Sequence, residues 1–98
     1  MVGPRPLLIV DDDATLRATL AEQLVIDGDL APAEAGTVAE AERMLTSGET
    51  RYDAVLLDVG LPDGDGCELC ARLRRQGLRI PVIMLTGNPA RAGLPWII

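Results

Sequence analysis

Three aspartates that directly follow expected strands are the residues best suited to chemistry in this sequence. Asp11 and Asp12 follow the apolar run Leu7–Val10, and Asp58 follows Asp53–Leu57. Carboxylates that pack together repel one another, so they must share a proton or bind a cation. Because the chain has no histidine, oxygen ligands of this kind suit a hard ion such as Mg²⁺. A divalent ion beside one carboxylate is what transfer of a phosphoryl group onto that carboxylate requires.

Strands and helices alternate along the segments that must position these aspartates. Short continuous apolar runs are typical of strands buried on both faces of a parallel sheet, and leucines at four-residue spacing mark a helix. The expected strands are 7–10, 30–35, 53–57 and 80–85, and the expected helices are 14–26, 37–47 and 67–76. This order predicts an α/β fold with a doubly wound parallel sheet. Pro32 makes the strand at 30–35 an edge strand, because proline cannot donate to a ladder.

The carboxyl ends of parallel strands are where ligands bind in such a sheet. If the first and third strands are neighbours, the three aspartates converge there. Thr86 follows the fourth strand and could donate a hydrogen bond to a phosphoryl oxygen. The glycine-rich segment 60–66 that follows Asp58 is expected to be irregular. The alternative interpretation, that strand-end aspartates only cap helices, is favoured for Asp13, which sits at a helix start.

Composition limits the possible functions. The chain has 98 residues, enough for one domain, and a net charge of −6 without a basic cluster, so direct nucleic-acid binding is not expected. Its apolar runs are too short to span a membrane, and the first residues lack the pattern of a signal peptide, so a cytoplasmic protein is expected. Cys67 and Cys70 are interpreted as helix residues one turn apart, because zinc would need further ligands.

Three segments together match the pattern of a known family. They are Leu7–Asp13 (LLIVDDD), Tyr52–Gly66 (YDAVLLDVGLPDGDG) and Pro81–Gly87 (PVIMLTG). Through them, over roughly residues 6 to 88, the chain resembles the receiver domains of two-component response regulators, the CheY-like family. The resemblance implies the flavodoxin-like strand order 2-1-3-4.

The resemblance also implies roles for individual residues. Asp58 would be the phospho-acceptor and would share a Mg²⁺ (or Mn²⁺) ion with Asp12 as a direct ligand and Asp11 acting largely through water. The backbone carbonyl of Gly60 would be a further ligand. Thr86 resembles the switch residue whose hydroxyl follows the phosphoryl group.

Two more residues, and the partners, follow from the same resemblance. Pro62 and Gly66 would shape the loop after the acceptor. The phosphoryl donor would be a sensor histidine kinase or a phosphotransfer protein. The chain would be a signalling domain rather than an enzyme, with self-dephosphorylation as its only catalysis.

The C-terminal part departs from the family pattern. A complete receiver continues through a helix, a fifth strand and a last helix, and carries a lysine that contacts the phosphoryl group. This chain contains no lysine, so impaired phosphotransfer is expected. Residues 1–88 are therefore predicted to form an incomplete receiver domain that lacks the fifth strand and the last helix, followed by a non-family tail at 89–98.

The tail bears on the expected assembly. Leu94–Ile98 could form a short strand, but a parallel crossover from the strand ending near Leu85 needs about a dozen residues. An exposed apolar edge strand invites pairing with another chain. A homodimer or higher oligomer that covers the strand 81–86 is therefore expected, with the tail strand as a contact.

Two other functions are compatible with parts of the sequence. Asp11-Asp12-Asp13-Ala14-Thr15 resembles the D-x-D-x-T motif of haloacid-dehalogenase-type phosphatases, in which Asp11 would attack phosphate and Asp13 would act as acid and base. That interpretation leaves Asp58 unexplained. The third possibility is an interaction module that is not phosphorylated, since fixed positive charge stabilises a transferring phosphoryl group and the lysine is missing. The residue that becomes phosphorylated separates the three possibilities.

Overall fold

A five-stranded sheet in the order β2-β1-β3-β6-β7 organises the chain. The computed structural model describes residues 3–26, 28–85 and 96–97. Along the chain the elements are β1 Arg5–Val10, α1 Ala14–Leu24, β2 Leu30–Ala35, α2 Val38–Thr46, β3 Ala54–Asp58, β4 Gly60–Leu61, β5 Gly64–Asp65, α3 Gly66–Arg75, β6 Val82–Leu85 and β7 Trp96–Ile97. β2, β1, β3 and β6 are parallel to one another. Because β6 is the fourth of the predicted strands, this confirms the predicted fold and its strand order 2-1-3-4.

The edge position of β2 is also confirmed. Pro32 lies in β2, opposite Leu7 of β1, and among the described strands β2 has a neighbour on one side only. An edge position is where a residue without an N–H donor can be accommodated in a sheet.

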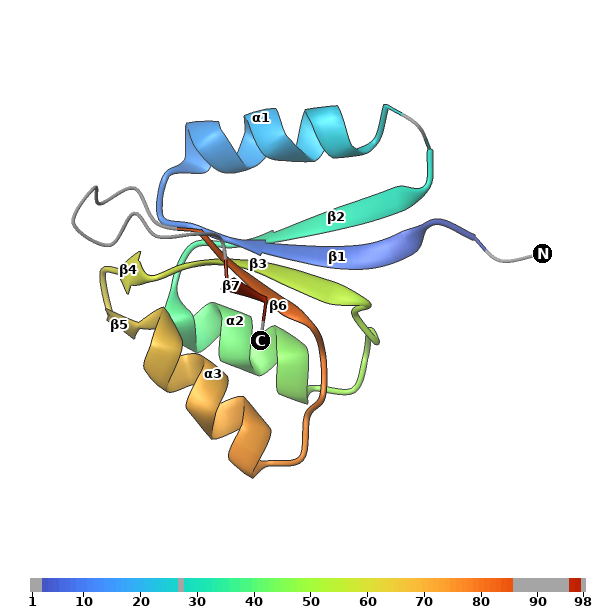
Figure 1. Ribbon diagram of the computed structural model, residues 1–98. Helices are drawn as coiled ribbons and strands as arrows, with labels where there is room; N and C mark the ends of the chain where they lie inside the picture. Colours follow the sequence, from blue (N-terminus) through green and yellow to red (C-terminus); the bar gives the residue numbers. More distant parts are fainter. Residues whose placement is uncertain (1–2, 27, 86–95, 98) are drawn as a thin grey trace.

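Helices cover the two faces of the sheet unequally. In Figure 1, α2 and α3 lie on one face and α1 lies alone on the other. Alternate strand residues point to the α2–α3 side and are almost fully buried, because two amphipathic helices close over them. The core on this side includes Leu8, Val10, Val55, Leu57, Leu69, Leu73, Val82 and Met84.

The face under α1 is less completely covered. Leu16, the first residue of the expected apolar stripe, is 42% exposed, and α1 contains no buried residue. The helix also ends at Leu24 rather than at Ile26, since Val25 closes it as the C-cap. The spacing of the leucines predicted the helix correctly, but it did not predict how fully these side chains are buried.

The loop after β3 contains regular structure that was not expected. Gly60 pairs with Asp65 and Leu61 with Gly64, so β4 and β5 form a small antiparallel hairpin. The prediction of an irregular segment was wrong here. The hairpin is anchored because Leu61 is buried in the core and the Gly66 N–H donates to the Val59 carbonyl at 2.8 Å.

The tail contributes a strand to the same sheet. β7 lies antiparallel to β6, with Trp96 opposite Met84 and Ile97 opposite Ile83. An antiparallel neighbour does not need the long crossover that a parallel one requires. At these two positions the edge of β6 is therefore paired within the chain, where the sequence had suggested pairing with a second copy.

None of the helices among the described residues is both long enough and apolar enough to cross a membrane.

Candidate functional site

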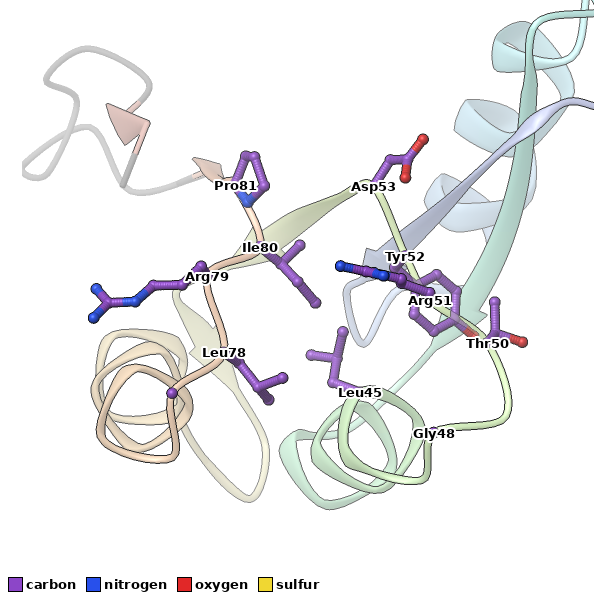
Figure 2. A pocket seen from close by; sticks show the side chains of 11 residues that line it. Leu45, Gly48, Thr50, Arg51, Tyr52, Asp53, Leu78, Arg79, Ile80 and Pro81 are labelled. Carbon is purple, nitrogen blue, oxygen red and sulfur yellow. The ribbon is translucent and has the colours of Figure 1, made fainter. Parts of the chain in front are cut away.

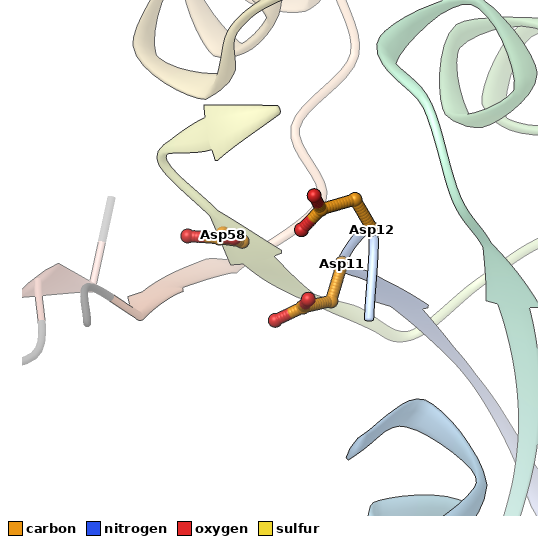
Figure 3. A group of neighbouring side chains, drawn as sticks. All are labelled: Asp11, Asp12 and Asp58. Atoms are coloured by element: carbon orange, nitrogen blue, oxygen red, sulfur yellow. The ribbon is translucent and has the colours of Figure 1, made fainter. Parts of the chain in front are cut away.

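The carboxylates of Asp11, Asp12 and Asp58 meet at the carboxyl ends of β1 and β3 (Figure 3). The two strands are paired up to Val10 and Leu57, so the next residues along each strand lie side by side. One ligand oxygen from each of the three aspartates lies within 4.8 Å of the others. The structure thus brings together three of the residues singled out in the sequence.

Backbone contacts hold Asp11 in place. Its N–H donates to the Ala35 carbonyl of β2 at 3.1 Å, and its Oδ1 accepts from the Asp13 N–H at 2.8 Å. Asp11 is only 8% exposed, whereas Asp12 is exposed. The pair therefore offers one fixed carboxylate and one that faces solvent.

Asp58 lies in an environment that disfavours its negative charge. Burial raises the pKa of Asp58 above its ordinary value of 3.8, and the charges of Asp11 and then Asp12 raise it further. The Gly60 N–H, which donates to the Asp58 Oδ1 at 3.4 Å, opposes this shift. A group with raised pKa at the end of a strand is a marker of a functional site.

These donors fit a hard divalent cation. All three side chains supply carboxylate oxygens, and their ligand atoms are close enough to share one ion. A cation would also remove the repulsion that raises the pKa of Asp58. The cluster is therefore able to hold a metal ion of the Mg²⁺ class.

The remaining predicted site residues lie on or near the hairpin. Gly60 begins β4 and is exposed, and Pro62 is in the turn between β4 and β5. Gly66 is buried at the start of α3, where a Cβ atom would lie 2.7 Å from the Asp58 backbone oxygen. Only glycine allows this approach to the backbone of Asp58. Thr86 lies outside the described residues.

Asp63, at the tip of the same turn, was missed in the sequence. Its two carboxylate oxygens accept from the N–H groups of Val38 and Ala39, at 2.8 and 3.1 Å, at the start of α2. These bonds lower the pKa of Asp63. The N-cap Thr37 did indicate a helix start with free amides, but nothing in the sequence indicated a partner from the loop after Asp58.

Asp13 has a structural role, as expected. It is the N-cap of α1, and its Oδ1 accepts from the Leu16 N–H at 3.0 Å. A phosphatase of the haloacid-dehalogenase type would need this carboxylate free for proton transfer. The capping geometry therefore does not favour that alternative.

A cavity of about 560 Å³ lies at the opposite end of the sheet, beside the starts of β3 and β6 (Figure 2). Leu45, Leu78 and Ile80 point into it. The carboxylate at its edge belongs to Asp53, which pairs with Arg5 at 3.7 Å. This cavity lacks the grouped carboxylates that phosphoryl chemistry requires, so the acidic cluster remains the candidate site.

Comparison with known proteins identifies the family of this chain. The family model described as "Response regulator receiver domain" matches residues 7–93. The chain belongs to this family. It is thus a receiver domain of the kind found in two-component response regulators, which are phosphorylated on aspartate, and receiver domains are in general signalling domains rather than enzymes.

Individual relatives share the receiver domain over most of this chain. The transcriptional regulatory protein TcrA of Mycobacterium tuberculosis is 42% identical over 85 residues, which are 86% of this chain and 32% of TcrA. This receiver domain thus spans about a third of the length of that relative. TrrA of Thermotoga maritima, solved in complex with Mg²⁺-BeF, has a TM-score of 0.79 and 31% identity, over 92% of this chain and 76% of that one. The NtrC4 receiver domain, solved as a beryllofluoride-activated dimer, has a TM-score of 0.74 and 32% identity, over 84% of this chain and 65% of that one.

Proposed function

We propose that this receiver domain accepts a phosphoryl group on Asp58 from a sensor histidine kinase or a phosphotransfer protein. The observation that carries the proposal is the convergence of the Asp11, Asp12 and Asp58 carboxylates at one end of the sheet. Asp58 is half-buried rather than enclosed, so its carboxylate can be reached by a donor.

A divalent cation is part of this proposal. Asp12 and Asp58 would bind Mg²⁺ or Mn²⁺ directly, Asp11 through water, and the Gly60 carbonyl would complete the protein ligands. Such an ion would neutralise charge on the phosphoryl oxygens. The structural relative TrrA was solved with Mg²⁺ and a beryllium fluoride group, which supports such a site in this chain.

The chain's own residues account for the transfer. The ionised Asp58 carboxylate attacks phosphorus in line, an acyl phosphate bond forms, and the bond from phosphorus to the donor's histidine nitrogen breaks. Burial, followed by the charges of Asp11 and Asp12, raises the pKa of Asp58, which makes its ionised carboxylate a better nucleophile. Gly66 allows the close packing beneath Asp58, and Pro62 shapes the turn of the hairpin. Thr86 would hydrogen-bond a phosphoryl oxygen, and slow attack of water would remove the group again.

Phosphorylation by a small donor tests the proposal. After incubation with Mg²⁺ and acetyl phosphate, intact mass measurement should show one added phosphoryl group. The Asp58→Ala variant should show none, and Asp53→Ala, at the other end of β3, should behave as the parent does. Phosphate retained in Asp58→Ala but lost in Asp11→Ala would favour the phosphatase alternative. No addition at any dose would favour an interaction module. Because the chain has no lysine, the reaction is expected to be slow.

We also propose that the domain forms a homodimer or higher oligomer through its less covered side, which includes the α1-facing residues of β6. Leu56, Ile83 and Leu85 are only half-buried, and Leu16 of α1 is exposed. A neighbouring apolar face of a second copy would cover these side chains. The NtrC4 receiver domain was solved as a dimer, which supports self-association but does not indicate the face. Light scattering should show a dimer or larger species, and a stable monomer at micromolar concentration would contradict the proposal.

A further inference from the structure

Arg17 of α1 reaches back to the turn that carries the acidic pair. Its Nη1 donates to the backbone carbonyl of Asp11 at 2.5 Å, and its Nε donates to the Glu34 carboxylate of β2 at 3.2 Å. The Arg17 side chain is 17% exposed, whereas that of Arg5, in its ion pair with Asp53, is 71% exposed. Hydrogen bonds from a charged donor are stronger than neutral ones, and covering them from solvent limits competition by water. The guanidinium is therefore held firmly between α1 and the sheet.

The bond to the Asp11 carbonyl acts on both members of the acidic pair. That carbonyl belongs to the planar peptide unit that joins Asp11 to Asp12. Fixing the oxygen fixes the plane, and with it the direction in which the chain enters Asp12. The other bonds of the turn are made by the Asp11 N–H and the Asp11 carboxylate, and neither of them reaches the Asp11 carbonyl oxygen. Arg17 therefore adds a direct restraint on this oxygen.

Gly36 provides the space that the guanidinium needs. A Cβ atom at Gly36 would lie 3.2 Å from Nη1 of Arg17, which is closer than an ordinary contact. The backbone of Gly36 is not in the left-handed region, so an alanine there would act through this contact and not through strain. Gly36→Ala can therefore press on the guanidinium without removing its charge.

We propose that Arg17 is a positioning residue that holds Asp11 and Asp12 in their cation-binding arrangement. This rests on the proposed phosphorylation site, because the cation is the one that would serve Asp58. Arg17 acts through the Asp11 carbonyl, because this is the atom of the acidic pair that its guanidinium contacts.

The competing explanation is that Arg17 only ties α1 to β2. A substitution of Glu34 distinguishes this role from the positioning role. Glu34→Gln breaks the ion pair between helix and sheet but leaves the bond from Arg17 to the Asp11 carbonyl. Arg17→Ala removes both. Arg5→Ala is the matched control, because it removes an arginine from an exposed ion pair at the other end of the sheet.

Two measurements on folded variants, checked by circular dichroism, test the proposal. Without metal, Arg17→Ala should speed hydrogen exchange of the Asp13 amide, which donates to the Asp11 carboxylate, by about tenfold. Mn²⁺ affinity, measured by electron paramagnetic resonance, should fall by about tenfold, the lower end of the effect known for residues that orient metal ligands. Glu34→Gln should change both much less, and Arg5→Ala should change neither.

Several outcomes would overturn the proposal. Unchanged Asp13 exchange in folded Arg17→Ala would do so, as would equal effects of Glu34→Gln and Arg17→Ala, which would leave only the tether. If Arg17→Ala does not fold, Gly36→Ala should shift both measurements in the same direction, and no shift would refute the role. Failure of the parent protein to bind Mn²⁺ or accept phosphate would instead reject the proposed function, while Asp13 exchange would still decide the role of Arg17.

Discussion

Replacing Asp58 with asparagine should stabilise the metal-free protein at neutral pH. Burial and the neighbouring carboxylates raise the pKa of Asp58 above its ordinary value of 3.8. The folded protein therefore binds this proton more tightly than the unfolded chain does. As pH rises from the ordinary pKa of an aspartate to the raised pKa of Asp58, the free energy of unfolding falls. The loss of stability is complete once Asp58 is ionised in the folded protein. Asparagine removes the charge and can still accept the hydrogen bond from the Gly60 N–H.

The geometry of the cluster gives the size of the effect. At the 4.8 Å that bounds the distances between ligand atoms, two unit charges repel by about 0.9 kcal/mol in a water-like dielectric. Asp58 faces two such partners, and screening over a Debye length of about 8 Å reduces the total to about 1 kcal/mol. For a domain of 98 residues, that corresponds to a rise in Tm of about 4 to 8 °C.

Thermal unfolding followed by circular dichroism in EDTA is the assay. Asp58→Asn should melt above the parent at neutral pH, and the difference should shrink at acidic pH, where Asp58 is protonated in both states. Saturating Mg²⁺ should reduce or reverse the difference in Tm between Asp58→Asn and the parent. An ion at 100 times its Kd adds about 2.7 kcal/mol to the free energy of unfolding of the protein that binds it. Asp53→Asn, which loses its pairing with Arg5, should not gain stability. An equal or lower Tm for Asp58→Asn in EDTA would refute the proposed repulsion.

Two further substitutions test the hairpin that follows Asp58. Gly66→Ala should lower the free energy of unfolding, measured in urea, by about 1 to 3 kcal/mol, because its Cβ would lie 2.7 Å from the Asp58 backbone oxygen. Gly60→Ala is the control, since a Cβ at Gly60 would meet no atom within 4 Å. Equal losses of stability in the two variants would contradict the explanation. Asp63→Ala should lower the Tm at neutral pH but not at strongly acidic pH. The pKa of Asp63 is lowered by its bonds to α2, so its stabilisation is present above the ordinary value and is lost as pH falls through the folded value; a difference that persists in acid would argue against the carboxylate bonds.

Much of the fold followed from local pattern. The apolar runs, the helix between each pair of strands and Pro32 were sufficient for the parallel sheet and its edge, because right-handed crossovers allow few arrangements. The β4–β5 hairpin could not be foreseen, since it depends on Leu61 reaching the core and on the bond between Gly66 and Val59. The exposure of Leu16 could not be predicted either, because the spacing of apolar residues shows which of them share a helix face but not how fully that face is covered.

The site also has a part that the sequence predicted and a part that it did not. Convergence of Asp11, Asp12 and Asp58 follows from strand adjacency, which the element order implied. The partners that hold the surrounding backbone come from distant parts of the chain. Asp63 caps a helix that begins 25 residues before it, and Arg17 joins the acidic turn to Glu34 of another strand. Such contacts depend on the packed geometry of side chains, which residue types alone do not specify.

The acidic cluster lowers the stability of the fold, and this cost indicates a functional site. At other described positions local preference and packing agree: the strand residues that face α2 and α3 are buried, Asp13 and Thr37 cap helices, and Gly66 stands where a Cβ would collide. At the ends of β1 and β3, by contrast, three like charges are held together at a cost to stability. A sequence selected only for stability would lose that cost through one substitution at Asp58. Local conflict of this kind is expected at functional sites, and a cation bound by the three carboxylates would relieve it.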